Sequence, residues 1–69
     1  MITVDINGVP KGVEPDIPVG VLVAQILGSG PLQGVAVAVN GEVVLRAEWA
    51  TVIVKDRDAV EIIRAIQGG

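Results

Sequence analysis

Residues 2–6 alternate between apolar and polar side chains, which is the period-2 pattern of a strand that buries one face. Asn7-Gly8 follows at once, and this dipeptide readily adopts the positive φ angles of a tight hairpin turn. The pattern therefore predicts a hairpin whose second strand covers residues 9–13. Because Pro10 and Pro15 cannot donate ladder hydrogen bonds, we expect this second strand at an edge of the sheet.

A different periodicity follows over residues 19–27. Its apolar side chains recur at i, i+3, i+4 and i+7, namely Val19, Leu22, Val23 and Ile26. This spacing places them on one face of a helix. Asp16 as an acidic cap, Pro18 as an early proline and Gly28 directly after the segment are helix start and stop signals. The β-branched residues and Gly20 favour a strand instead, but the stripe and the boundary signals favour the helix.

The clearest strand of the chain covers residues 35–39, where valine alternates with alanine. The breaker-rich segment 28–34 before it predicts a loop, and Asn40-Gly41 after it predicts a second hairpin that returns over 42–45. The remaining predicted elements are, in order, a short helical turn at 46–50 anchored by Trp49, an extended piece at 51–54, a charged turn at 55–58 and a final alternating strand at 59–66.

The predicted order is thus hairpin, helix, hairpin and last strand. Strands joined by tight turns are antiparallel neighbours, and a strand–helix–strand crossover gives a parallel pair. One mixed sheet of four or five strands packed on one helix satisfies both conditions. This α+β arrangement is the β-grasp, or ubiquitin-like, architecture, and we expect residues 1–69 to form a single such domain.

Composition limits how such a domain can be stabilised. The chain of 69 residues is 51% hydrophobic and contains no cysteine and no histidine. No disulfide framework or Cys/His zinc site can form, so the fold depends on a dense aliphatic core. Trp49 is the only aromatic residue, and we expect a lone aromatic side chain in so small a domain to fill the core rather than to stack on a ligand.

The charges exclude two classes of partner. The formal net charge is −3, and the five cationic residues are scattered along the chain. A nucleic-acid interface needs clustered cations, so no nucleic-acid partner is expected. The longest aliphatic stretches fall well short of the ~18 residues of a membrane span, and the first residues lack the pattern of a leader peptide. We expect a cytoplasmic protein with no membrane partner.

The titratable side chains favour structural roles. With no histidine or cysteine, the chain lacks the groups that most enzymes use near neutral pH, so we do not expect an enzyme. Asp56 and Asp58 flank Arg57 in the predicted charged turn, where carboxylates commonly bind local backbone N–H groups. Two carboxylates are too few for a metal cage, so no metal site is expected. Glu42 and Glu48 are interpreted as solvated surface charges.

The Gly68-Gly69 tail has a specific chemical use. Without Cβ atoms these two residues can enter a narrow channel and bend within it, while the folded body docks outside. A terminal carboxylate is ionised at neutral pH and can act as a nucleophile toward an activated phosphate. A frayed end with no function is the alternative interpretation, and the tail alone does not decide between the two.

A family resemblance adds to this interpretation. The segment 35–50, VAVAVNGEVVLRAEWA, resembles the central signature of the thiamine-biosynthesis sulfur carriers, the ThiS family, in which a small-residue strand, an Asn turn, a valine-rich return, an Arg and a Glu/Gln-Trp recur. The segment 56–69, from Asp-Arg-Asp to Gln-Gly-Gly, resembles the family's closing segment, and the opening strand with Asn7-Gly8 is also similar. The resemblance covers the whole chain and is strongest from Val35 onward. Arg57 stands where the family usually has glycine, which argues against a positive φ angle at that turn.

The resemblance implies a sulfur carrier whose reacting group is the carboxylate of Gly69, with Gln67 and Gly68 as the flexible tail. A ThiF-like adenylating enzyme would use ATP and Mg²⁺ to convert that carboxylate into an acyl-adenylate. A sulfur donor such as a cysteine desulfurase would then displace AMP and leave a thiocarboxylate. Thiazole synthase would take the sulfur for the thiazole of thiamine. The carrier itself would bind no cofactor, because its partners supply the chemistry.

Docking on these partners is expected to use an exposed face of the sheet. If the valines of residues 35–39 point at the helix, the period-2 rule places a set of small and aliphatic side chains on the opposite face. These are Ala36, Ala38, Ile63 and Ala65. Their position leading toward the tail makes them the predicted docking surface.

Three alternative functions remain open for this sequence. A molybdopterin-synthase-type sulfur carrier has the same fold and tail but a different synthase as its partner. A ubiquitin-like modifier would be joined to lysines through Gly69. A β-grasp interaction module would make no use of its terminal glycines.

Overall fold

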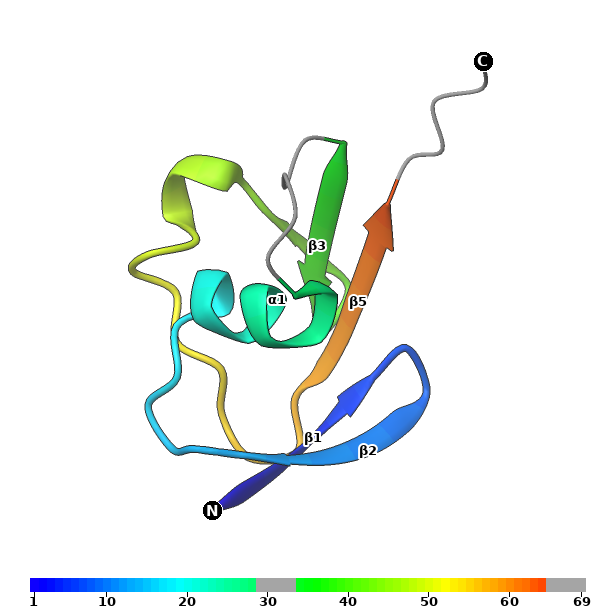
Figure 1. Ribbon diagram of the computed structural model, residues 1–69, viewed down its shortest axis with the longest axis vertical. Helices are drawn as coiled ribbons and strands as arrows, with labels where there is room; N and C mark the ends of the chain where they lie inside the picture. Colours follow the sequence, from blue (N-terminus) through cyan, green and yellow to red (C-terminus); the bar gives the residue numbers. More distant parts are fainter. Residues whose placement is uncertain (29–33, 65–69) are drawn as a thin grey trace.

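The alternating segments form strands in the computed structural model, which describes residues 1–28 and 34–64 (Figure 1). In chain order the elements are β1 (Ile2–Ile6), β2 (Val9–Val13), α1 (Val19–Leu27), β3 (Val35–Val39), β4 (Glu42–Val44), the 3-10 helix η1 (Arg46–Glu48) and β5 (Ala59–Arg64). Both hairpins, the helix and the last strand are confirmed. Strand β4 ends one residue earlier than predicted, and the predicted loop residues 29–33 and strand residues 65–66 lie outside the described part.

The five described strands form one mixed sheet in the order β2-β1-β5-β3-β4. Antiparallel pairs join β1 to β2, β3 to β4 and β3 to β5, whereas β1 and β5 run parallel. The sheet curves around helix α1, and β5 lies between β1 and β3 (Figure 1). Strand β2, which carries Pro10, is at an edge as predicted. This is the expected strand pattern of the β-grasp architecture.

Both hairpin turns have the backbone angles that their Asn-Gly pairs predict. The φ angles are 51° at Asn7 and 88° at Gly8, and 52° at Asn40 and 83° at Gly41. Two consecutive positive φ angles define the type I′ turn, whose twist matches that of the strands it joins. The two Asn residues therefore sit at equivalent positions in the two hairpins.

Helix α1 buries the predicted stripe but begins differently from the prediction. Val19, Leu22 and Val23 are fully buried, and Ile26 packs against the core at its edge. The N-cap residue is Pro18, and no side chain caps the helix. Asp16 is therefore not the acidic cap that the sequence suggested; its own φ angle is 61°, which places it in a turn before the helix. Proline needs no acceptor for a missing N–H, which makes it suitable near a helix start.

Trp49 lies in the core, as expected for the lone aromatic residue. Its side chain is 5% exposed, and its Nε1–H donates a hydrogen bond of 3.1 Å to the carbonyl oxygen of Val44. The guanidinium of Arg46 covers the ring at 4.5 Å from its centroid. Gly20 donates its backbone N–H to the carbonyl oxygen of Trp49 at 2.9 Å. Helix α1 thus packs directly on the backbone of the segment that follows η1.

The rest of the core is aliphatic, as the composition requires. Its buried members besides Trp49 are Val4, Ile6, Val13, Ile17, Val19, Leu22, Val23, Val37, Val44, Val54, Val60 and Ile62. Burial of these side chains is the main favourable term for folding. Among residues 1–28 and 34–64, no helix is long and apolar enough to cross a membrane.

Candidate functional site

Strand β5 leads to the predicted tail, and side-chain hydrogen bonds reinforce its position. The parallel ladder with β1 pairs Asp5 with Ala59 and Ile6 with Val60. Beyond the end of β1, the side chain of Asn7 replaces the backbone as the hydrogen-bond partner of β5. Its Oδ1 accepts the N–H of Ile62 at 2.9 Å, and its Nδ2 donates to the Ile62 carbonyl oxygen at 3.0 Å. The Asn7 side chain therefore acts as one more peptide unit of the ladder.

Asn40 in the other hairpin holds the beginning of the same strand. Its Oδ1 accepts the N–H of Ala59 at 2.9 Å, and its Nδ2 donates to Oδ1 of Asp58 at 3.0 Å. Its backbone N–H also donates to the Ala59 carbonyl oxygen at 2.8 Å. Two turns of the same type thus hold β5 from its two flanks. The Asn-Gly pairs predict the two turns, but no pattern in the sequence predicts these bonds.

Both carboxylates of the charged turn before β5 bind backbone N–H groups, a local one in the case of Asp58, as predicted, and a distant one in the case of Asp56. Asp58 accepts the N–H of Lys55 through Oδ2 at 2.8 Å, and Asp56 accepts the N–H of Thr3 through Oδ1 at 2.9 Å. Arg57 nevertheless has a φ angle of 70°, contrary to the expectation from its side chain. Its backbone N–H donates to the Thr3 carbonyl oxygen at 2.7 Å, and this bond helps to hold the turn in the left-handed region.

The predicted docking residues share the face of the sheet that points away from α1. Ala36 pairs with Ile63, and Ala38 lies between Glu61 on β5 and Val43 on β4. The residues that alternate with them along β3 and β5 are in the core, which places this set on the outer face. Ile63 is 60% exposed and Val43 is 71% exposed. We call Ala36, Ala38, Val43 and Ile63 the outer-face patch.

Val43 is not among the predicted docking residues, although its position between Glu42 and Val44 in a period-2 strand could have indicated it. Of the other predicted site residues, Ala65, Gln67, Gly68 and Gly69 lie outside the described residues. Among residues 1–28 and 34–64, no group of three or more acidic side chains could hold a metal ion.

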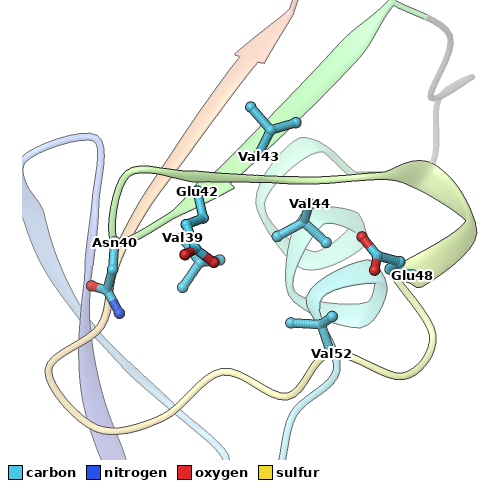
Figure 2. Close-up of a pocket in the computed structure, with 7 residues that line it drawn as sticks. All are labelled: Val39, Asn40, Glu42, Val43, Val44, Glu48 and Val52. Atoms are coloured by element: carbon cyan, nitrogen blue, oxygen red, sulfur yellow. The ribbon is translucent and has the colours of Figure 1, made fainter.

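A second surface feature is a hollow of about 420 Å³ on the inner side of β4 (Figure 2). It is lined by Val39, Asn40, Glu42, Val43, Val44, Glu48 and Val52. The carboxylate of Glu48 accepts the N–H of Leu45 through Oε1 at 3.2 Å, which closes the first turn of η1. Glu42 and Glu48 are both exposed, as predicted, but they face one concave surface.

Comparison with known proteins extends this description. The chain is similar to the crystal structure of thiamine biosynthesis protein ThiS from Geobacter metallireducens, with 33% identity, a TM-score of 0.80 and coverage of 99% of this chain and 100% of that one. It is also similar to an NMR solution structure of a thiamine biosynthesis protein from Geobacter metallireducens, with 33% identity, a TM-score of 0.76 and coverage of 99% and 88%. A search of curated proteins finds no match. The model of the ThiS family matches residues 4–69, and the chain therefore belongs to the ThiS family.

Proposed function

We propose that this chain is a sulfur carrier of thiamine biosynthesis and that Gly69 is the residue that carries the sulfur. The observation that supports this most directly is the family match over residues 4–69, because it includes the Gly-Gly end. The similar proteins named above are thiamine biosynthesis proteins and cover almost the whole chain. The molybdopterin-type carrier, the modifier and the interaction module have no comparable observation in their favour.

In this proposal the chemistry takes place on Gly69 and is catalysed by partners. A ThiF-like adenylating enzyme uses ATP and Mg²⁺ to form an acyl-adenylate on the Gly69 carboxylate with release of pyrophosphate, and AMP is then the leaving group for the next step. The persulfide of a sulfur donor such as a cysteine desulfurase displaces AMP and forms an acyl disulfide with Gly69. A thiol reductant then cleaves the S–S bond and leaves Gly69 as a thiocarboxylate. Thiazole synthase then receives the sulfur. The chain contributes the reacting carboxylate and a docking surface, so it is not itself an enzyme, and we place it in the cytoplasm with these partners.

The described residues suit this role in two ways. Asn7 and Asn40 fix the strand from which the tail departs, so a partner that binds the folded body has a defined origin for the tail. The outer-face patch offers apolar side chains on β5 and on the neighbouring strands β3 and β4, and its member on β5, Ile63, lies six residues before Gly69. Exposed apolar side chains grouped on one face are suited to binding a protein. We therefore propose this patch as the docking surface for the adenylating enzyme.

The test is intact-mass spectrometry of the protein isolated from its native cells. The expected result is a fraction of the protein whose mass is raised by the difference between one sulfur and one oxygen, located at Gly69 by fragmentation. The control is a variant with one bulky residue added after Gly69, which should show no exchange. Protein-linked adducts in place of the sulfur exchange would contradict the carrier and support a modifier.

A further inference from the structure

The hollow beside β4 combines an apolar floor with acidic walls. Figure 2 shows the carboxylates of Glu42 and Glu48 on either side of the space that contains the side chains of Val44 and Val52. Val39 completes the apolar part of the lining. The two acidic side chains come from different elements, because Glu42 begins β4 and Glu48 ends η1. The fold therefore brings them together around one group of valines.

The negative charge of this hollow is not neutralised within the part of the chain that the structure describes. Neither Glu42 nor Glu48 forms an ion pair there; the ion pair that is present joins Arg57 to Asp56 at 3.9 Å. Glu48 accepts the N–H of Leu45 through Oε1, and the side chain of Glu42 has no hydrogen bond to another described residue. Both carboxylates therefore retain acceptor capacity toward a cationic ligand.

We propose that this hollow binds an arginine side chain of a protein partner. The methylene groups of arginine would lie on the valines, and its guanidinium would reach the carboxylates. The planar guanidinium has five N–H donors and can bond to two carboxylates at once, which the point charge of lysine does with less directional control. A bare metal ion would leave the valines uncovered and would have only two acidic side chains for ligands.

The position of the hollow indicates which partner would supply the arginine. Val43 belongs both to the outer-face patch and to the lining of the hollow. A protein that covers the patch therefore reaches the rim of the hollow across β4. In this respect the inference rests on the proposed function, since that function supplies a partner that docks on the patch.

An NMR titration of the full-length chain tests the hollow without any partner. The probe is N-acetyl-arginine methylamide, and N-acetyl-citrulline methylamide is its neutral control of nearly equal shape. We expect saturable shifts of the backbone amides of Leu45 and Val52 with the arginine compound and much smaller ones with citrulline. Glu42→Gln and Glu48→Gln should each weaken the binding about two- to fivefold, the range for loss of one exposed ion pair.

Two features keep this test specific. Glutamine at position 48 can still accept the Leu45 N–H, so the Glu48→Gln variant removes the charge and keeps η1 closed. Glu61→Gln removes the same charge from the outer face and should leave the titration unchanged. Equal shifts with both compounds, or equal weakening by Glu61→Gln, would overturn the proposal. Because the probe does not involve Gly69, a protein that binds arginine but carries no sulfur would contradict the proposed function alone.

Discussion

Both backbone polar groups of Ile62 bond to the side-chain amide of Asn7, 55 residues earlier in the chain. The bonds begin where strand β1 ends, so the side chain continues a parallel ladder that the backbone of β1 has left. A turn residue thereby becomes part of the central pairing of the sheet. The asparagine is needed for two reasons, since it also tolerates the positive φ angle of the turn.

The Asn7→Asp variant separates these two reasons. Aspartate tolerates the positive φ angle of the turn, and its carboxylate can accept the N–H of Ile62. It cannot donate to the Ile62 carbonyl oxygen. We expect the free energy of unfolding to fall by about 1–3 kcal/mol, the cost of leaving one partly buried acceptor without its partner. Urea denaturation followed by Trp49 fluorescence measures this loss. Gln25→Glu adds the same charge on the exposed face of α1 and should change stability by no more than about 0.5 kcal/mol.

Arg57 occupies a backbone conformation that suits glycine better. Its φ angle is 70°, and its side chain is 92% exposed, with one distant ion pair to Asp56. Arg57→Gly relieves about 1–2 kcal/mol of left-handed strain and loses about 0.5–1 kcal/mol through the greater freedom of the unfolded chain. We expect a net gain of about 0.5–1 kcal/mol in urea denaturation. Arg57→Ala removes the same side chain but keeps the strain, so an equal gain in that variant would refute the explanation.

Local patterns predicted the elements because local forces decide them. The period-2 alternation of side chains predicted β1, β3 and β5, and the Asn-Gly pairs predicted both type I′ turns. The apolar stripe from Val19 to Ile26 predicted α1. Each of these signals involves residues that are close in sequence. The same logic placed Ala36, Ala38 and Ile63 on one face, because period 2 fixes the face once the core is known.

The features that the sequence did not reveal depend on contacts between distant segments. The bonds of Asn7 and Asn40 to β5 require the register of the whole sheet, which no local pattern contains. The left-handed Arg57 is held by the Thr3 carbonyl oxygen, again from another segment. Asp16 was assigned to the helix cap on its residue type, but the Pro18–Ile53 bridge fixes the chain just before α1 and leaves Pro18 as the N-cap.

Gly20 has the lowest helix propensity in α1, and the structure shows how large a side chain can be placed there. A Cβ atom on Gly20 would lie 3.4 Å from both the Cβ atom and the carbonyl oxygen of Trp49, which is ordinary contact. Gly20→Ala should therefore raise the free energy of unfolding by about 0.5–1 kcal/mol through its better helix propensity. Gly20→Leu should instead destabilise the fold, because a longer side chain must displace Trp49. Thermal denaturation of the two variants checks both signs; a stable leucine variant would show that the helix does not pack closely here.

Ile63 is the residue through which the docking proposal can be tested. Its side chain is 60% exposed and is the large apolar side chain of the outer-face patch on β5, whereas its neighbour Ile62 is 7% exposed in the core. Ile63→Asp should leave the fold intact, with at most about 1 kcal/mol lost to poorer strand propensity. It should weaken binding to the adenylating enzyme about tenfold or more, because a charge replaces a large apolar side chain of the proposed docking surface.

Two matched variants serve as controls for this measurement. Val9→Asp places the same charge on a side chain that is 63% exposed on the edge strand β2, far along the sheet order from β3, and should not change the affinity. Ile62→Asp should unfold the protein, which would confirm the assignment of the two faces. Isothermal titration calorimetry gives the affinities, and Trp49 fluorescence reports the fold in each variant. Because Ile63→Asp and Val9→Asp differ in position and not in chemistry, equal affinities for the two would remove the outer-face patch from the docking surface.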